Sequence, residues 1–369
     1  MKLINIILSV FVIGLVTMPS YASSDKVSSE VNGTNKLKAL EQWIDEKGKI
    51  GQLSGTFLFA RKGKVLLKKA VGNVHPDHDR PIVLDSSFNL ASVSKQFTAM
   101  AIMLLSYQGK LNYDAKVKSH LAEFPYPNIT VRHLLNHTSD LADYMELAEE
   151  HWNKETLTNQ DMLNLFNKHK PALAFVPGSK FEYSNTGYVT LSAIVERVSK
   201  MSFAHYLKKH VFQPLSMDHT RVVNLLSEPN LLPSRVYGQN SKGLDDLVYL
   251  DGVSGDGAVY SSVDDLLKWH YGLVDNKLLP KKLQEAAFTP ATLNDGLLFH
   301  YGFGWFIDRK SPHIVAHSGG WVGFISYIAR NTQSDEVIIL LTNKVDGIEF
   351  EELQKRIFSS LDADFGEFQ

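Results

Sequence analysis

The segment FNLASVSKQFTAM, residues 88–100, sets the strongest constraint on the fold, because it predicts a buried helix with reactive side chains at its start. Ser92 and Lys95 stand at positions i and i+3, a spacing that puts both on one helix face. The apolar run from Phe97 to Leu105 predicts that the lysine stem is buried. Burial favours the neutral amine, which can take the serine proton and make the hydroxyl a nucleophile. Free N–H groups at the helix start suit an oxyanion.

A serine and a lysine at this spacing also occur in ordinary helices, where the serine caps the helix and the lysine is solvated. Two later segments favour a reactive site. Tyr183-Ser184-Asn185 follows a turn at Pro177-Gly178, and His317-Ser318-Gly319-Gly320 lies between two runs that are typical of strands. A turn alone would account for the first segment and a β-bulge for the second. The order of all three segments is more specific than any one of them.

In this order the three segments resemble the motifs of the penicillin-recognising serine hydrolases, which include class C β-lactamases, D-alanyl-D-alanine carboxypeptidases, D-aminopeptidases and related esterases. The resemblance covers residues 37–361. It implies an α+β, transpeptidase-like fold: a five-stranded antiparallel sheet built from both chain ends, packed against helices, beside an all-helical region. Residues 133–141 and 255–269 also resemble family segments, but Asp140 stands where glycine is usual and Asp256 where a small residue is usual.

Hydrophobic periodicity agrees with that fold. It predicts a hairpin from 55–61 and 65–71, later strands at 301–308, 314–318, 323–330 and 336–342, and helices that include 37–48, 159–168, 189–199, 203–211 and 349–361. We therefore expect one hydrolase domain over 36–369, with its sheet region at about 36–80 and 296–365 and the helical region between them.

The resemblance implies a chemical role for each motif residue. Ser92 would attack the carbonyl of an amide, lactam or ester and form an acyl-enzyme. Either Lys95 or Tyr183 would take its proton, and the sequence leaves that choice open. Asn185 would hydrogen-bond Lys95 and a substrate amide. A water activated by Tyr183 with Lys95 would hydrolyse the acyl-enzyme.

The third motif departs from the β-lactamase pattern, because His317 replaces the usual lysine. Histidine would supply a weaker, pH-dependent positive field for Tyr183 and for a substrate carboxylate. Ser318 and Gly319 would line the substrate site. By resemblance, the N–H of Gly320 would pair with that of Ser92 as the oxyanion hole.

Three functions are compatible with these motifs. The first is an exported serine hydrolase acting on D-amino-acid peptides, of carboxypeptidase or aminopeptidase type, or on small esters. The second is a class C-like β-lactamase, which His317 disfavours because it anchors a carboxylate weakly. The third is a non-catalytic protein that binds peptidoglycan fragments or a partner. The intact set of serine, lysine, tyrosine and histidine disfavours it, since binding alone needs no nucleophile beside a base.

The N-terminus predicts export. Lys2 is followed by an apolar run from Leu3 to Met18, and Ser20 and Ala22 are small residues at −3 and −1 of a cleavage site. We expect a signal peptide over 1–22 and a flexible tether over 23–35, and hence a periplasmic or secreted protein without a stable membrane span. An uncleaved anchor helix is the alternative, but the run is shorter than the roughly 20 residues that span a bilayer.

Charge and composition narrow the partners. With 38 basic and 40 acidic side chains the formal net charge is −2, so no basic field favours nucleic acid. The absence of cysteine excludes disulfides and thiolate chemistry. The run His75-Pro76-Asp77-His78-Asp79 is typical of a turn, and His133 and His137 lack the glutamate of a zinc protease motif. We expect a small-molecule or peptide substrate, no metal and no cofactor; the sequence does not specify an oligomeric state.

Overall fold

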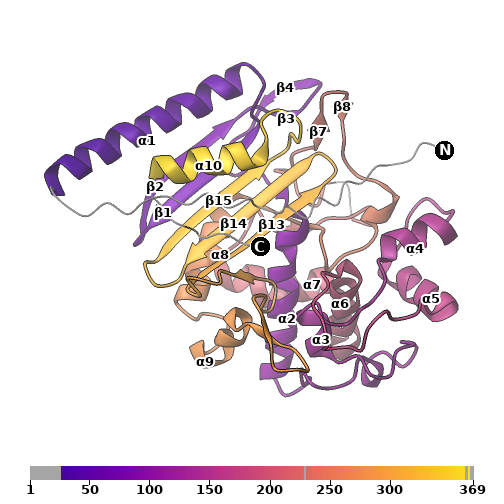
Figure 1. Cartoon of the computed structure of the whole chain (residues 1–369). Coiled ribbons are helices and arrows are strands. Elements are labelled where there is room, and N and C mark those ends of the chain that lie inside the picture. The colour runs from indigo at the N-terminus through magenta and orange to yellow at the C-terminus, as the bar shows by residue number, and fades with distance from the viewer. Residues whose placement is uncertain (1–25, 228–229, 362–364, 366–369) are drawn as a thin grey trace.

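The computed structural model describes residues 26–227, 230–361 and 365. The predicted signal peptide therefore lies outside the described residues. Within them the chain forms an antiparallel sheet with helices on both faces, beside a region made mainly of helices (Figure 1).

The main sheet joins the two ends of the chain. It has six strands in the order β12-β13-β14-β15-β1-β2, and β15 pairs antiparallel with β1 from Gly55↔Thr342 to Arg61↔Glu336. The predicted assembly from both termini is confirmed, but the sheet has one more strand than the five expected, because the short β12 pairs with β13 at Phe306↔Ala316. The six strands are β1 (Gly55–Arg61), β2 (Lys64–Val71), β12 (Phe306–Ile307), β13 (Ile314–Trp321), β14 (Phe324–Asn331) and β15 (Glu336–Thr342).

Side chains alternate between the two faces of this sheet, as the two-residue period of a strand requires. In β1, Phe57 and Phe59 pack under the terminal helices α1 (Lys26–Lys49) and α10 (Phe350–Leu361). Leu58 and Ala60 point into the core that is shared with the helical region. Figure 1 shows α1 and α10 lying together over one face of the sheet. The opposite face packs against α8 (Val263–Val274).

The start of the first helix differs from the prediction. Helix α1 begins at Lys26, so residues 26–35, which were expected to form a flexible tether, are helical. The stretch contains Gly33 but no proline, and an isolated glycine weakens a helix without breaking its hydrogen bonding.

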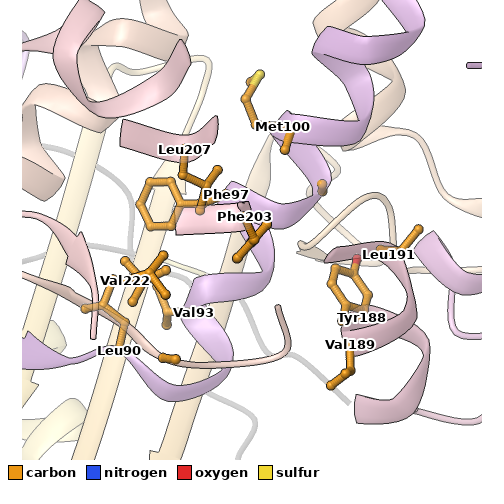
Figure 2. Packing of buried hydrophobic residues seen from close by; sticks show 14 of the residues in the cluster. Leu90, Val93, Phe97, Met100, Tyr188, Val189, Leu191, Phe203, Leu207 and Val222 are labelled. Atoms are coloured by element: carbon orange, nitrogen blue, oxygen red, sulfur yellow. The ribbon is translucent and has the colours of Figure 1, made fainter. Parts of the chain in front are cut away.

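The helical region surrounds α2 (Lys95–Tyr107), which is buried from Lys95 to Leu105. A helix that is apolar on all sides needs neighbours on all sides. Figure 2 shows Phe97 and Met100 of α2 packed near Phe203 and Leu207 of α7. The other helices are α3 (Val131–Leu135), α4 (Tyr144–His151), α5 (Asn159–His169), α6 (Asn185–Ser199), α7 (Phe203–Leu207) and α9 (Lys281–Gln284).

The predicted helix over 203–211 is interrupted, because α7 ends at Leu207 and a π-helical turn, η3 (Lys208–Phe212), follows. The 3₁₀ turns are η1 (Ala91–Ser94), η2 (Val117–Ser119), η4 (Gln213–Leu215), η5 (Tyr249–Asp251) and η6 (Glu285–Phe288). The short strands are β3 (Asn73–His75), β4 (His78–Pro81), β5 (Phe88–Asn89), β6 (Arg221–Val222), β7 (Gln239–Asn240), β8 (Gly243–Leu244), β9 (Val259–Ser261), β10 (Ala291–Thr292) and β11 (Leu298–Phe299).

The segment rich in histidine and aspartate forms the turn of the β3–β4 hairpin. Among the described residues, no group of three or more His, Cys, Asp or Glu side chains is arranged to hold a metal ion. Nor does any helix in the described part of the chain have the length and apolar character needed to cross a bilayer.

Candidate active site

The nucleophile candidate lies in a 3₁₀ turn rather than in the α-helix itself. Strand β5 leads into η1, which holds Ser92, and α2 begins at Lys95. Ala91 has a φ of 44°, a left-handed conformation, and its N–H donates to the Asn89 side-chain oxygen at 2.8 Å. This turn brings Ser92 and Lys95 together, because the Lys95 Nζ donates to the Ser92 Oγ at 3.0 Å.

The Lys95 amine is enclosed by oxygen acceptors. Its side chain has no solvent exposure, and besides Ser92 it donates to the Asn185 side-chain oxygen at 2.8 Å and to the Asp256 carbonyl at 2.9 Å. Burial lowers the pKa of Lys95 to about 8, although the nearby Asp256 and Asp143 carboxylates oppose the shift. An amine with this pKa can accept and return a proton near neutral pH.

Tyr183 covers the other side of the amine. The Lys95 Nζ lies 5.0 Å from the centre of the Tyr183 ring. The phenol oxygen is buried and has no well-formed hydrogen bond to any described residue, although Ser92 is close enough to lower its pKa. Burial is the larger effect and raises the pKa of Tyr183 well above its usual range. The resting phenol is therefore neutral.

Asn185 reaches Lys95 because α6 begins at that residue. Ser184 caps the helix, since its hydroxyl accepts the N–H of Gly187 at 3.1 Å. The middle residue of the second motif thus orients the residues on either side of it. A side chain in the first turn of α6 is held firmly, and this precision is what an amide that contacts both lysine and substrate needs.

Strand β13 brings the third motif against the nucleophile turn. A Cβ on Gly319 would lie 2.4 Å from the Leu90 carbonyl oxygen and 2.8 Å from the Ser92 nitrogen, so no larger residue fits there. The Ser326 hydroxyl of β14 donates to the same Leu90 carbonyl at 2.6 Å. Gly320 has open space where a side chain would be, and the Ser318 side chain is exposed. Backbone N–H groups at this edge can face a carbonyl bound at Ser92.

His317 differs from its predicted behaviour. It is only 2% exposed, and burial together with the Lys95 charge lowers its pKa to about 3. Its Nδ1 lies 2.6 Å from the Ser318 carbonyl and donates to it, while its Nε2 lies 3.1 Å from the Tyr301 hydroxyl and accepts from it. Burial thus favours the neutral imidazole, whereas the sequence predicted a weak, pH-dependent positive field.

Two residues that the sequence did not assign to the site support Tyr183. His137 is fully buried, and its ring centre lies 4.2 Å from that of Tyr183. Its Nδ1 accepts the N–H of Ser184 at 3.0 Å, and burial lowers the pKa of His137 well below its usual value. Tyr301 contacts His137 at 4.5 Å between ring centres. Only the family-like segment 133–141 pointed to this region.

The structure shows the surroundings of Asp140 and Asp256, the two residues that depart from the family pattern. Asp140 has a φ of 60°, which explains why glycine is usual there, and its carboxylate accepts the N–H of Phe175. Asp256 lies beside Lys95, and its Oδ2 accepts from the Tyr144 hydroxyl at 3.2 Å. Nearby, Asp251 accepts from the Trp321 indole at 2.8 Å. This wall of the site is acidic.

A serine hydrogen-bonded to a buried lysine, beside a tyrosine and a strand with two glycines, is the arrangement of a class of serine hydrolases built on a sheet with terminal helices. The beta-lactamase family model matches residues 40–358. The chain belongs to this family and is a serine hydrolase of the β-lactamase and penicillin-binding type.

Relatives and solved structures agree with this assignment. A protein of Bacillus subtilis (strain 168), named as a penicillin-binding protein, is 38% identical over 334 residues, which cover 86% of this chain and 74% of the relative. The crystal structure of a penicillin-binding protein from Bacillus halodurans is 26% identical with a TM-score of 0.74, over 87% of this chain and 99% of the other. The D-amino acid amidase of Ochrobactrum anthropi SV3 shares the fold, with a TM-score of 0.73 at 21% identity over 88% and 98% of the two chains.

Proposed function

We propose that this protein is an exported serine hydrolase that forms an acyl-enzyme on Ser92 and acts on D-amino-acid peptides or small esters. The observation that carries the proposal is the state of the Lys95 amine. It is buried, it donates a hydrogen bond to the Ser92 hydroxyl at 3.0 Å, and its pKa is lowered to about 8. Such an amine is matched to proton transfer near neutral pH. The names of the relatives, penicillin-binding protein and D-amino acid amidase, agree with acyl transfer at a D-amino-acid centre.

In the proposed reaction the Ser92 oxygen attacks the substrate carbonyl and its proton passes to Lys95. The oxyanion accepts hydrogen bonds from the N–H groups of Ser92 and Gly320. The proton then moves to the leaving group, with the neutral Tyr183 phenol as its carrier. The raised pKa of Tyr183 favours Lys95 as the base and the phenol as a relay. Water repeats these steps to release the acyl group.

The neutral His317 bears on substrate choice. A β-lactam or a peptide ending in a free carboxylate presents a negative charge that a lysine in the third motif would bind. Here the imidazole is neutral, since its pKa is about 3. The proposal therefore favours uncharged acyl substrates, such as amides and esters, over β-lactams. Class C-like β-lactamase activity remains the competing function, and a non-catalytic binding protein is the third.

Active-site labelling tests the nucleophile. Wild-type protein is incubated with a fluorophosphonate or a fluorescent penicillin, and the intact mass is measured. We expect one adduct that is absent in Ser92→Ala and present in Ser359→Ala, whose serine is exposed on α10 at the far face of the sheet. Failure of both probes to label the wild type would refute the acyl-enzyme.

Turnover separates the three functions. Steady-state hydrolysis is compared for D-Ala-D-Ala peptides, D-aminoacyl amides, p-nitrophenyl butyrate and nitrocefin. We expect amide or ester turnover to exceed nitrocefin turnover and to disappear in Ser92→Ala and fall strongly in Tyr183→Phe. Efficient nitrocefin hydrolysis would instead identify a β-lactamase. Equal inertness of wild type and variants would identify the binding protein.

A further inference from the structure

Asp256 contacts the Lys95 amine through its main chain, and its carboxylate lies nearby. Its main-chain carbonyl accepts a hydrogen bond from the Lys95 Nζ at 2.9 Å. Its carboxylate is held by the Tyr144 hydroxyl, which donates to Oδ2 at 3.2 Å. Tyr144 is the first residue of α4 and is buried, and this hydrogen bond restrains the half-buried Asp256 side chain. One residue therefore offers the amine both a hydrogen-bond acceptor and a nearby acidic group.

The surroundings of Lys95 leave few groups that can balance its charge. Two aromatic rings face it, Tyr183 at 5.0 Å and Tyr188 at 5.7 Å. The buried histidines His137 and His317 are neutral at physiological pH, because burial and the lysine charge lower their pKa values. The carboxyl groups that act on the amine are Asp256 and, more weakly, Asp143 at the start of α4.

Asp256 itself lies beside other acidic groups. Burial raises the pKa of its carboxyl group, and the Lys95 charge and the Tyr144 hydroxyl oppose that shift. Asp143 and Asp251 lie near Asp256, and burial, with a smaller contribution from the Asp256 charge, raises the pKa of each to about 6. Two interacting groups in such a site titrate as a pair. The proton state of Lys95 thus depends on its acidic neighbour.

We propose that Asp256 is a positioning residue that acts through Lys95: its carboxylate keeps a proton on the buried amine to higher pH, and so sets the pH range in which Ser92 is acylated. The proposal rests on the proposed function, since it needs Lys95 to serve Ser92. It also explains what a charged side chain does at a place where a small residue is usual in similar sequences.

The direction of the effect does not depend on which role Lys95 has. As the base, Lys95 must lose its proton, so it would set the acid limb of the pH profile. As a cation beside Tyr183, it must keep the proton, so it would set the alkaline limb. Removing the Asp256 charge releases the proton more readily in both cases. The limb that reports Lys95 therefore moves to lower pH.

The experiment measures the rate of Ser92 labelling by an uncharged fluorophosphonate from pH 5 to pH 10.5. Wild type is compared with Asp256→Asn and Asp256→Gly. We expect the limb that lies near pH 8 in the wild type to move down by about one pH unit in both variants, the size expected for a close opposite charge. A purely structural role for Asp256 would lower the rate at every pH and leave the limb in place.

Asp251→Asn is the matched control. The substitution removes a carboxylate on the same wall of the site, one that does not shift the pKa of Lys95. The limb of its pH profile should therefore lie at the same pH as in the wild type. Asp143→Asn removes the weaker of the two acidic neighbours and should move the limb in the same direction by less. If the Asp256 variants do not fold, Asp143→Asn still measures how a nearby carboxylate shifts the pH limb of Lys95.

The outcomes separate the two proposals. If folded Asp256→Asn and Asp256→Gly keep the wild-type limb, the role of Asp256 is refuted while the hydrolase stands. An equal shift in Asp251→Asn also refutes it, because the effect would then come from the overall field. If the wild type is not labelled at Ser92 at any pH, the proposed function fails, and the role of Asp256 fails with it.

Discussion

At the scale of single residues, the site depends on two glycines that differ sharply in their surroundings. Gly319 is in contact with the backbone of the nucleophile turn, at 2.4 Å from the Leu90 oxygen to where its Cβ would be. Gly320, the next residue of β13, faces open space. Adjacent positions in one motif thus have different reasons to be glycine: the first is required by packing and the second leaves room for a ligand.

Alanine substitutions should separate these reasons. In Gly319→Ala the new methyl group would push β13 away from Ser92. We expect a loss of about 1–3 kcal/mol in the free energy of unfolding and at least a roughly 100-fold slower labelling of Ser92. Gly320→Ala, the neighbour with room for a Cβ, should unfold within about 0.5 kcal/mol of the wild type. Urea unfolding and labelling rates check both, and wild-type behaviour of Gly319→Ala would contradict the packing.

His317 should leave a signature in the pH dependence of stability. Its pKa is about 3 in the folded protein and about 6.5 in an unfolded chain. Below pH 6.5 the unfolded state therefore binds a proton that the folded state does not. Its contribution to stability is complete above pH 6.5 and is lost as the pH falls toward 3.

The variant His317→Gln removes this proton uptake. Between pH 6 and pH 4, the unfolding free energy of the wild type should fall faster than that of the variant by about 1.4 kcal/mol per pH unit. Between pH 7.5 and pH 9 the difference between the two proteins should stay constant. Urea unfolding at each pH measures both ranges. Parallel curves below pH 6 would mean that the imidazole is charged in the folded protein.

At the scale of elements, the terminal helices hold a sheet whose strands come from opposite ends of the chain. Helix α10 buries Leu353, Ile357 and Leu361 against the same face that receives Leu40 and Ile44 of α1. Since β13 carries the third motif and β1 lies three strands away in the same sheet, with β14 and β15 between them, this small core supports the site without touching it. The core includes Ile314 and Ala316, so it packs against the strand that carries the third motif.

Truncating the apolar face of α10 should weaken the whole domain. Ile357 has no exposed surface, so we expect Ile357→Ala to cost about 2–5 kcal/mol of unfolding free energy. Lys355→Ala, on the exposed side of the same helix, should change it by less than about 0.5 kcal/mol. Thermal or urea unfolding gives the comparison. An Ile357→Ala protein as stable as Lys355→Ala would show that α10 is not docked as described.

At the scale of the whole molecule, the terminal helices α1 and α10 lie on the sheet, on the side away from the helical region (Figure 1). The N-terminal helix α1 covers the face of the sheet opposite to α2.

The proposed leader makes a prediction about the mature chain. When the full sequence is expressed in a bacterial host, we expect export and an N-terminus at Ser23, because Ser20 and Ala22 are small residues at −3 and −1. Intact mass and N-terminal sequencing of the exported protein measure this. Ala22→Arg should block cleavage, whereas Ser24→Arg should not. A wild-type protein that retains residues 1–22 would support the anchor alternative.

Much of the fold could be predicted because its signals are local. The bounds of β1 and β15 agree with the sequence prediction, since both strands are apolar runs bounded by turn residues. Ser92, Lys95, Tyr183 and Asn185 were chosen from motifs, and the structure brings their side chains together around one amine. Residues 26–35 were missed because a polar segment carries no periodic signal.

The sequence by itself determined which residue types come together in the site, because the three motifs are recognised by their residue spacing and by their order along the chain. Only the tertiary structure decided their charges. The neutrality of His317, the lowered pKa of Lys95 and the nearness of Asp256 all follow from burial among segments far apart in sequence. A pKa depends on the local dielectric and on neighbouring charges, and neither exists until those segments are packed together.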